Sequence, residues 1–230
     1  MPESDPIARS AFIGRATISQ IRQGWEMPAD RATGPLKIDD LSAVAKVLVK
    51  APATPEVDEA VGSRFGRAAW YGERLVCGAA PDEWLIMAPV GTAAQTVEHF
   101  RAAVTAVTRQ LTTVMDLTHG RALLRIRGAN TLRLLHRLTA IDLDDRFVPQ
   151  GAALRTSVAR VVTDVVRDDV ADEPSYLLHC ERSSGRYLLE SLLAAGSDLD
   201  AYIDGGPSWP DHAPQRHDVT GESHRGAPHS

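Results

Sequence analysis

Short blocks of alternating apolar and polar residues fill the middle of the chain, and they predict strands interleaved with helices. Strands are predicted where β-branched and apolar residues lie between turn residues, at 69–71, 74–77, 84–88, 113–116, 122–127, 153–166 and 176–180. Helices are predicted where apolar residues recur every three or four positions: from Asp39 or Asp40 through Leu48, from Thr92 through Leu111, at 130–138 and at 183–195. The order indicates an α+β fold of ferredoxin-like β-α-β units, with mostly antiparallel sheet and helices packed on one face.

The two ends of the chain are patterned differently from this middle. Residues 1–35 form an N-terminal arm that we expect to be partly ordered, with a short helix predicted at 11–23. Residues 36–203 form the patterned domain. Residues 204–230 are rich in proline, glycine and polar residues, and we expect them to form a disordered tail. Four histidines in this tail have no standard metal-ligand spacing, so no metal site is predicted.

Composition narrows the class of protein. The 230 residues are 43% apolar and 24% charged, which argues against a chain that is disordered throughout. A net charge of −5 and only 5% aromatic residues argue against a nucleic-acid-binding protein. No apolar run approaches the ~20 residues of a membrane helix, and the first twenty residues lack a signal-peptide centre. We therefore expect a cytoplasmic protein whose two cysteines are reduced.

The common motifs of self-contained enzymes do not occur in the sequence. There is no GxGxxG or GxxxxGK[ST] phosphate-binding loop, no GxSxG nucleophile turn and no HExxH metal motif. Together these observations argue against a nucleotide enzyme, a hydrolase or a metalloenzyme. His179 lies within a predicted strand and is interpreted as structural.

A basic run between Asp116 and Asp142 reverses the acidic sign of the chain. It contains no acid and includes Arg121, Arg125, Arg127, Arg133 and Arg137. Guanidinium groups bind carboxylates and phosphates bidentately, so the run could hold a small anion. It could also dock an acidic partner surface or form a solvated face. The spacing leaves these three interpretations open.

Two further segments could carry chemistry. The segment 141–145 holds three carboxylates, and Asp142 could act as a general base or a ligand anchor, although clustered acids in a loop are common. Arg182 and Ser183 lie where a strand leads into a helix. Ser183 could cap that helix, and its N-terminus could bind an anion.

These segments occur in the order that is found in one family. The sequence resembles the gamma subunit of heterotetrameric sarcosine oxidase from about Leu36 to Leu193. The resemblance rests on the ordered segments Pro81–Leu85, Asp116-Leu117-Thr118 with Arg121, Arg125–Gly128, Ile141-Asp142-Leu143 with Phe147, Gly151 and Thr156, and Arg182-Ser183.

The resemblance implies a fold similar to the folate-binding domain of aminomethyltransferases. It also implies an accessory subunit without redox chemistry, in a complex with alpha, beta and delta subunits that oxidatively demethylates sarcosine to glycine. FAD, FMN, NAD and tetrahydrofolate would then lie on partner subunits, and this chain alone would bind no cofactor. Arg121, Arg125, Arg127, Arg182 and Ser183 become candidate residues for subunit contacts or anion binding.

Two alternatives stay open. The chain could be a free-standing tetrahydrofolate-binding one-carbon transfer protein, with Asp142 as its folate contact. It is about half the length of the aminomethyltransferases and lacks their C-terminal domain, which counts against this hypothesis. It could also be the equivalent subunit of a complex that acts on another N-methyl amino acid. The sequence decides neither the substrate nor the stoichiometry.

Overall fold

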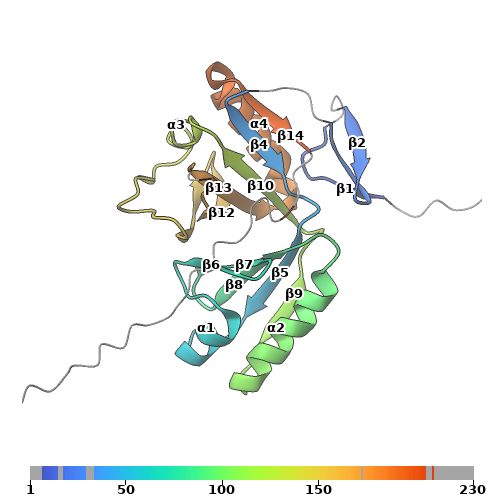
Figure 1. Cartoon of the computed structure of the whole chain (residues 1–230), viewed down its shortest axis with the longest axis vertical. Coiled ribbons are helices and arrows are strands. Elements are labelled where there is room, and N and C mark those ends of the chain that lie inside the picture. The colour runs from blue at the N-terminus through green and yellow to red at the C-terminus, as the bar shows by residue number, and fades with distance from the viewer. Residues whose placement is uncertain (1–6, 15–17, 30–33, 172, 206–208, 210–230) are drawn as a thin grey trace, which may run out of the picture.

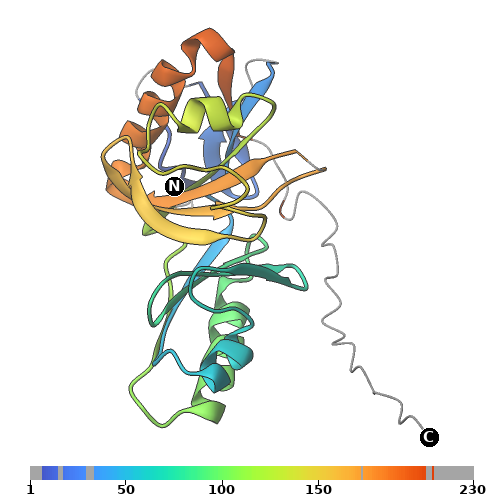
Figure 2. The same ribbon diagram turned by 90° about the vertical axis from the view of Figure 1, so that its left-hand side faces the viewer.

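Sheets stacked between helices make up the part of the chain that the structure describes. The structure is a computed structural model, and it describes residues 7–14, 18–29, 34–171, 173–205 and 209. Within these residues, two large sheets face each other and helices cover the outer face of each (Figures 1 and 2). The predicted α+β class, with mostly antiparallel sheet and helices on one face, is confirmed.

The first large sheet, called the β10 sheet, has the strand order β11-β12-β13-β10-β4-β14, and only the β4–β14 pair is parallel. Its strands are β4 (Leu36–Asp40), β10 (Arg121–Arg127), β11 (Ala153–Val158), β12 (Val161–Arg167), β13 (Ser175–Glu181) and β14 (Ala201–Asp204). Its outer face is covered by α3 (Thr131–Leu135), α4 (Arg182–Ala195) and the 3-10 turn η1 (Ser197–Leu199).

The second large sheet, called the β5 sheet, has the order β6-β7-β8-β5-β9 with all neighbours antiparallel. Its strands are β5 (Ala45–Lys50), β6 (Ala68–Tyr71), β7 (Arg74–Ala80), β8 (Glu83–Ala88) and β9 (Thr113–Asp116). Helices α1 (Pro55–Val61) and α2 (Ala93–Val107) pack on its outer face. The strands predicted in this region are confirmed. The long helix after Thr92 is also confirmed, but it ends at Val107 and not at Leu111.

The side chains of strand β10 alternate between two faces as predicted, and both of these faces are buried. Ala122, Leu124 and Ile126 point into the core beneath α3 and α4, whereas Leu123 joins the apolar layer between the two sheets. Arg125 points the same way as Leu123, because side chains alternate along a strand. An arginine therefore lies in the interior of the protein.

The predicted helix at 11–23 is wrong. Ser19–Arg22 is strand β2, which pairs with β3 (Trp25–Pro28), and β1 (Ala8–Arg9) lies on the other side of β3. Gln23 and Gly24 form the two-residue hairpin loop with φ values of 49° and 77°. Positive φ at both loop residues matches the twist of a hairpin, which is why Gly24 marks a turn and not a helix.

The predicted helix from Asp39 or Asp40 through Leu48 is also wrong. Asp39 and Asp40 are the last residues of β4, residues 45–48 belong to β5, and only 41–44 connect the two strands. β5 is buried along nearly its whole length. Apolar spacing of three and four also suits a strand that is buried on both faces, so the pattern alone was ambiguous. After β5, Pro55 begins α1 (Pro55–Val61), where Thr54 caps the N-terminus and Gly62 ends the helix at φ 91°.

The C-terminal region is described as far as Gly205, with Trp209 in addition. Trp209 packs on Trp70, with 5.2 Å between ring centroids. The predicted disordered tail, 204–230, is wrong at its start, because Asp204 is the last residue of β14 and pairs with Asp39 of β4. Residues 206–208 and 210–230, which include its four histidines, lie outside the described residues. Among the described residues, no helix is both long and apolar enough to cross a membrane.

Candidate functional site

Arg125 is the centre of a buried polar cluster between the two sheets. Its side chain is 1% exposed, and the Asp168 side chain that it contacts is 3% exposed. Arg125 Nη2 donates to Asp168 Oδ2 at 2.7 Å, while Nη1 donates to the Asp168 carbonyl and to Ser175 Oγ, both at 2.9 Å. Trp70 Nε1 donates to Asp168 Oδ1 at 2.9 Å. Arg125 is thus removed from any surface, which corrects its place among the candidate contact residues.

The other arginines of the basic run lie nearer the surface and are paired with carboxylates. Arg121 Nη1 lies 2.5 Å from Glu181 Oε1, and Arg127 Nε lies 2.8 Å from Asp39 Oδ2. Arg133 and Arg137 both reach Asp198 beyond the end of α4. The sequence could not show these pairs, because every acid comes from a distant segment.

Arg182 and Ser183 begin α4 beside an open groove of about 580 Å³, which is lined by Arg9, Ser10, Ala11, Ile13, Gly120, Glu181, Arg182 and Ser183. The predicted capping by Ser183 is wrong: the helix starts at Arg182, with Glu181 at the N-cap position, and no side chain among the described residues caps its N-terminus. Arg182 donates to the Arg9 carbonyl, so it connects α4 to the N-terminal arm. Ser183 is exposed in this groove.

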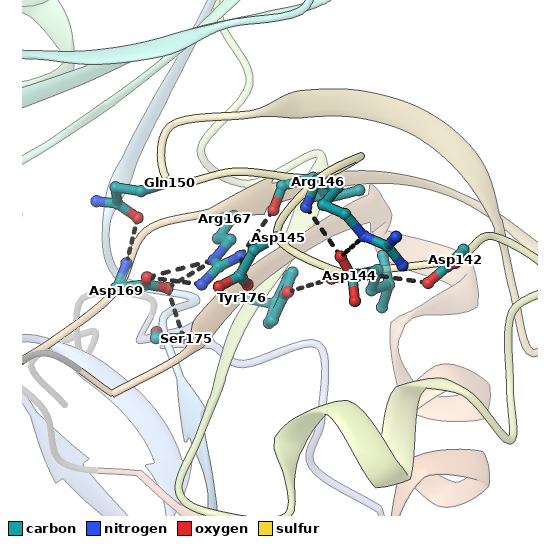
Figure 3. A network of polar contacts seen from close by, with 11 residues as sticks. Asp142, Asp144, Asp145, Arg146, Gln150, Arg167, Asp169, Ser175 and Tyr176 are labelled. Atoms are coloured by element: carbon teal, nitrogen blue, oxygen red, sulfur yellow. Dashed lines mark hydrogen bonds and ion pairs between the residues drawn. The ribbon is translucent and has the colours of Figure 1, made fainter.

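Asp142 lies on an exposed loop between α3 and β11. Its Oδ1 accepts a hydrogen bond from the Asp144 backbone N–H at 3.0 Å, and Asp144 Oδ1 in turn accepts from Arg146 Nε at 2.8 Å. The Arg146 guanidinium lowers the pKa of the Asp144 carboxyl. Figure 3 places Asp142 at one end of this network. Its carboxylate shapes a turn at the surface and lines none of the cavities named here.

Arg167 holds the same loop at its other end (Figure 3). This guanidinium pairs with Asp145 of the loop and with Asp169, at 3.0 Å from Nε to Oδ1, and Nη1 donates to the Val148 carbonyl at 2.8 Å. Tyr176 lies beneath it, with its hydroxyl toward the Leu143 carbonyl. The acids of segment 141–145 therefore serve in part to fasten the loop to the β10 sheet.

A row of charged side chains crosses the inner face of the β10 sheet. Arg155 of β11 is in register with Asp164 of β12, which is in register with His179 of β13. Arg155 Nε lies 2.6 Å from Asp164 Oδ1, and His179 Nδ1 lies 3.0 Å from Asp164 Oδ2. His179 is 3% exposed, and its Nε2 has no hydrogen-bond partner in the described part of the chain.

The facing β5 sheet supplies the opposite wall. Lys50 of β5 pairs with Glu83 of β8 at 3.0 Å, and Arg155 Nη2 spans the gap between the sheets to Glu83 Oε1 at 2.9 Å. The two walls enclose a cleft of about 300 Å³, called the charged cleft, which is lined by Leu48, Lys50, Glu83, Arg121, Arg155, Val162, Asp164, His179 and Glu181. Polar residues of widely separated strands meet here, so only the strand register reveals the site.

The protonation states in the charged cleft follow from burial and from the ion pairs. Burial lowers the pKa of His179 and outweighs the nearby Asp164 carboxylate, so the imidazole is neutral at pH 7. Burial alone would raise the pKa of Asp164, but the hydrogen bonds from His179 and Arg155 outweigh burial and lower it. An ionised carboxylate only accepts, so His179 donates from Nδ1 and keeps a lone pair on Nε2.

A second buried polar group lies where the chain crosses from β4 to β5. Lys46 Nζ donates to the carbonyls of Ser42 and Val44 at 2.8 and 2.7 Å, and burial lowers its pKa to about 7. Asp40 nearby is bound by Ser10 Oγ at 2.5 Å, and burial raises its pKa. Neither residue was singled out from the sequence as a polar site, because the segment was interpreted as an amphipathic helix.

Comparison with protein families shows to which family the chain belongs. The sequence profile of the sarcosine oxidase gamma subunit family matches residues 51–197. The chain belongs to this family. The match includes every strand of the β5 sheet except β5 itself, and every strand of the β10 sheet except β4 and β14. It also includes every charged residue of the charged cleft except Lys50. Comparison of the sequence with curated proteins gives no match.

Solved structures with the same fold support this result. A chain of heterotetrameric sarcosine oxidase from Corynebacterium sp. U-96 superposes with a TM-score of 0.62 and 20% identity, covering 74% of this chain and 89% of that one. The glycine cleavage system aminomethyltransferase T from Bartonella henselae superposes with a TM-score of 0.63 and 15% identity, covering 82% of this chain and 56% of that one. The predicted similarity to aminomethyltransferases is confirmed at the level of fold.

Proposed function

We propose that the chain is an accessory subunit of a sarcosine oxidase complex and promotes assembly with a large alpha subunit, beside beta and delta subunits. The complex oxidatively demethylates sarcosine to glycine. The observation that carries the proposal is the family match over residues 51–197. The superposition on 89% of a chain from a heterotetrameric sarcosine oxidase supports it.

The division of labour in this proposal places the redox groups elsewhere. FAD, FMN, NAD and tetrahydrofolate would be held by the partner subunits, and this chain would contribute contact surface. In the described residues, no three histidine, cysteine, aspartate or glutamate side chains converge as metal ligands. Arg121, Arg127, Arg182 and Ser183 stay candidates for subunit contacts, while Arg125 is engaged in the interior.

Purification of the tagged full chain from its native cells tests the proposal directly. We expect a stoichiometric complex with larger chains, a flavin absorbance spectrum, and oxidation of sarcosine with release of glycine. A panel of other N-methyl amino acids then tests the related alternative, a complex with a different substrate. A colourless chain that is recovered alone would refute the assembly role, and tetrahydrofolate titration with Asp142→Ala would then test the folate alternative.

A pair of variants tests whether the groove at the start of α4 is a subunit contact. Ser183→Arg places a long cationic side chain in the groove. Thr105→Arg introduces the same side chain, with the same change in charge, at an exposed position of α2. We expect Ser183→Arg to reduce recovery of the complex, whereas Thr105→Arg leaves it intact. Equal recovery with both variants would place the contact elsewhere without affecting the proposal of assembly.

A further inference from the structure

We propose that the charged cleft is a binding site for a small zwitterionic amino acid, whose carboxylate meets Arg121 and whose N–H group meets Nε2 of His179. The inference uses only side chains of this chain. It does not depend on the proposed assembly, and the two can fail separately.

The acceptor in the cleft is His179. Its Nδ1 is fixed by Asp164 at 3.0 Å, which orients the ring. Within the described residues this leaves Nε2 as an unpaired acceptor, in a side chain that is 3% exposed. A buried polar atom without a partner is unfavourable, and native proteins satisfy almost all of them. Because Nε2 can only accept in the neutral tautomer, its partner must carry an N–H or O–H group.

The donor in the cleft is Arg121. Among the described residues it makes a single ion pair, through Nη1 to Glu181, whose side chain is 63% exposed. The remaining N–H groups of this guanidinium are therefore free for a second carboxylate, which arginine binds in a fork geometry. Arg121 lies on β10 opposite Glu181 of β13, two residues along that strand from His179. Donor and acceptor thus lie close together on one sheet.

The balance of charge selects the class of ligand. Three cationic side chains, Lys50, Arg121 and Arg155, line the cleft with three anionic ones, Glu83, Asp164 and Glu181. With neutral His179 the formal sum is zero, so a phosphate or a dicarboxylate gains no net attraction. A ligand with one positive and one negative group can pair with both kinds of side chain.

The size of the cleft selects a small ligand. Its volume of about 300 Å³ lies at the lower end of the range for ligand pockets. His179 also lines an inner void of about 10 Å³, which holds at most one water molecule. A single water on Nε2 is the competing explanation, and it predicts that the wider cleft binds no amino acid.

The test is a titration of the purified full chain, with its histidine rings labelled with ¹³C, by glycine and N-methylglycine. The His179 signal is assigned by its loss in His179→Gln. We expect a saturable shift of the His179 Cε1–H signal with either amino acid, and none with acetate or methylammonium, which carry only half of the ligand. Calorimetry on the same samples gives the dissociation constants.

Two arginine variants separate binding from folding. Arg121→Gln removes the carboxylate partner, and we expect the dissociation constant to rise at least about tenfold. Arg186→Gln makes the same change on α4, where Arg186 pairs with Glu190 on the outer side of the β10 sheet, and we expect no change. Absence of a saturable shift in the unmodified chain, or equal binding by both variants, would overturn the proposal. The first result would leave water as the partner of Nε2.

Discussion

From the buried ion pair between Arg125 and Asp168 we predict that loss of the guanidinium strongly lowers the free energy of unfolding. Arg125→Met removes the guanidinium but keeps a long apolar side chain of similar reach, so little space is left empty. Asp168 then loses the donor at 2.7 Å to its Oδ2. Among the described residues it keeps only Trp70, which donates to Oδ1, and it remains almost completely buried. The variant therefore holds an uncompensated charge in the interior.

The expected loss follows from this geometry. Removing one partner of a buried pair lowers the free energy of unfolding by about 3–5 kcal/mol, because the other charge stays desolvated. For a chain of this size each kcal/mol corresponds to about 2–4 °C, so we expect the melting temperature to fall by roughly 6–20 °C. The exposed pair of Arg186 and Glu190 provides the control, and Arg186→Met should cost less than about 0.5 kcal/mol.

The assay is urea denaturation followed by circular dichroism, extended to a double-mutant cycle. Asp168→Asn keeps an acceptor for Trp70 and removes the charge. We expect it to destabilise the native chain but to stabilise Arg125→Met, because there it removes the unpaired carboxylate. If Asp168→Asn changes the free energy of unfolding equally in both backgrounds, the two charges are not coupled. In that case the reasoning from burial fails.

Three other perturbations test particular residues. Lys46 has a pKa of about 7 in the folded chain against 10.5 when exposed, so the unfolded state binds more protons between these two pH values. The free energy of unfolding should therefore rise with pH from about 7 to 10, by up to about 1.4 kcal/mol per pH unit. Lys46→Met should lose this rise when denaturation is followed as a function of pH. Gly128→Ala should cost roughly 2 kcal/mol or more in thermal unfolding, because its φ is 118° and a Cβ would overlap a neighbouring carbonyl; Gly66→Ala, at φ 82° with open space around it, should cost about 1 kcal/mol, and equal losses would contradict the overlap. Cys77 and Cys180 should resist iodoacetamide at pH 8 until urea is added, since burial raises both thiol pKa values, that of Cys180 to about 11; mass spectrometry of the native chain would reveal any labelling.

The sequence predicted strands well where a turn residue separated them. Gly72-Glu73 and Pro81-Asp82 delimit the strands of the β5 sheet, and these residues fix φ or favour turns by local chemistry. It failed at 39–48, where the strands are buried on both faces and apolar residues show no period of two. The prediction is wrong here because a strand that is covered on both faces has apolar residues at successive positions. Which faces are covered is known only from the tertiary structure.

The candidate site was harder to predict than the fold for a related reason. Arg125 looked like a residue of an exposed alternating face, but its partner Asp168 is 43 positions away and the β5 sheet covers that face. His179 is interpreted as structural from the sequence because it lies within a predicted strand. Asp164 becomes its partner only through the antiparallel register of β12 and β13. A single sequence contains no signal for that register beyond the apolar pattern.

The two polar clusters between the sheets differ in one respect that separates a structural role from a binding role. In the first, both guanidinium nitrogens Nη1 and Nη2 of Arg125 and both carboxylate oxygens of Asp168 have partners within the chain. A ligand could enter there only by breaking these bonds. In the second, His179 Nε2 has no partner in the part of the chain that the structure describes, although Asp164 binds Nδ1 of the same ring. An unpaired buried acceptor is unfavourable, so a ligand that donates a hydrogen bond to His179 Nε2 stabilises the second cluster. The first cluster has no unpaired atom of this kind on Nη1, Nη2 or the Asp168 carboxylate, so it gains nothing from a ligand. Addition of the amino acid should therefore slow amide hydrogen exchange around the charged cleft and leave it unchanged around Arg125.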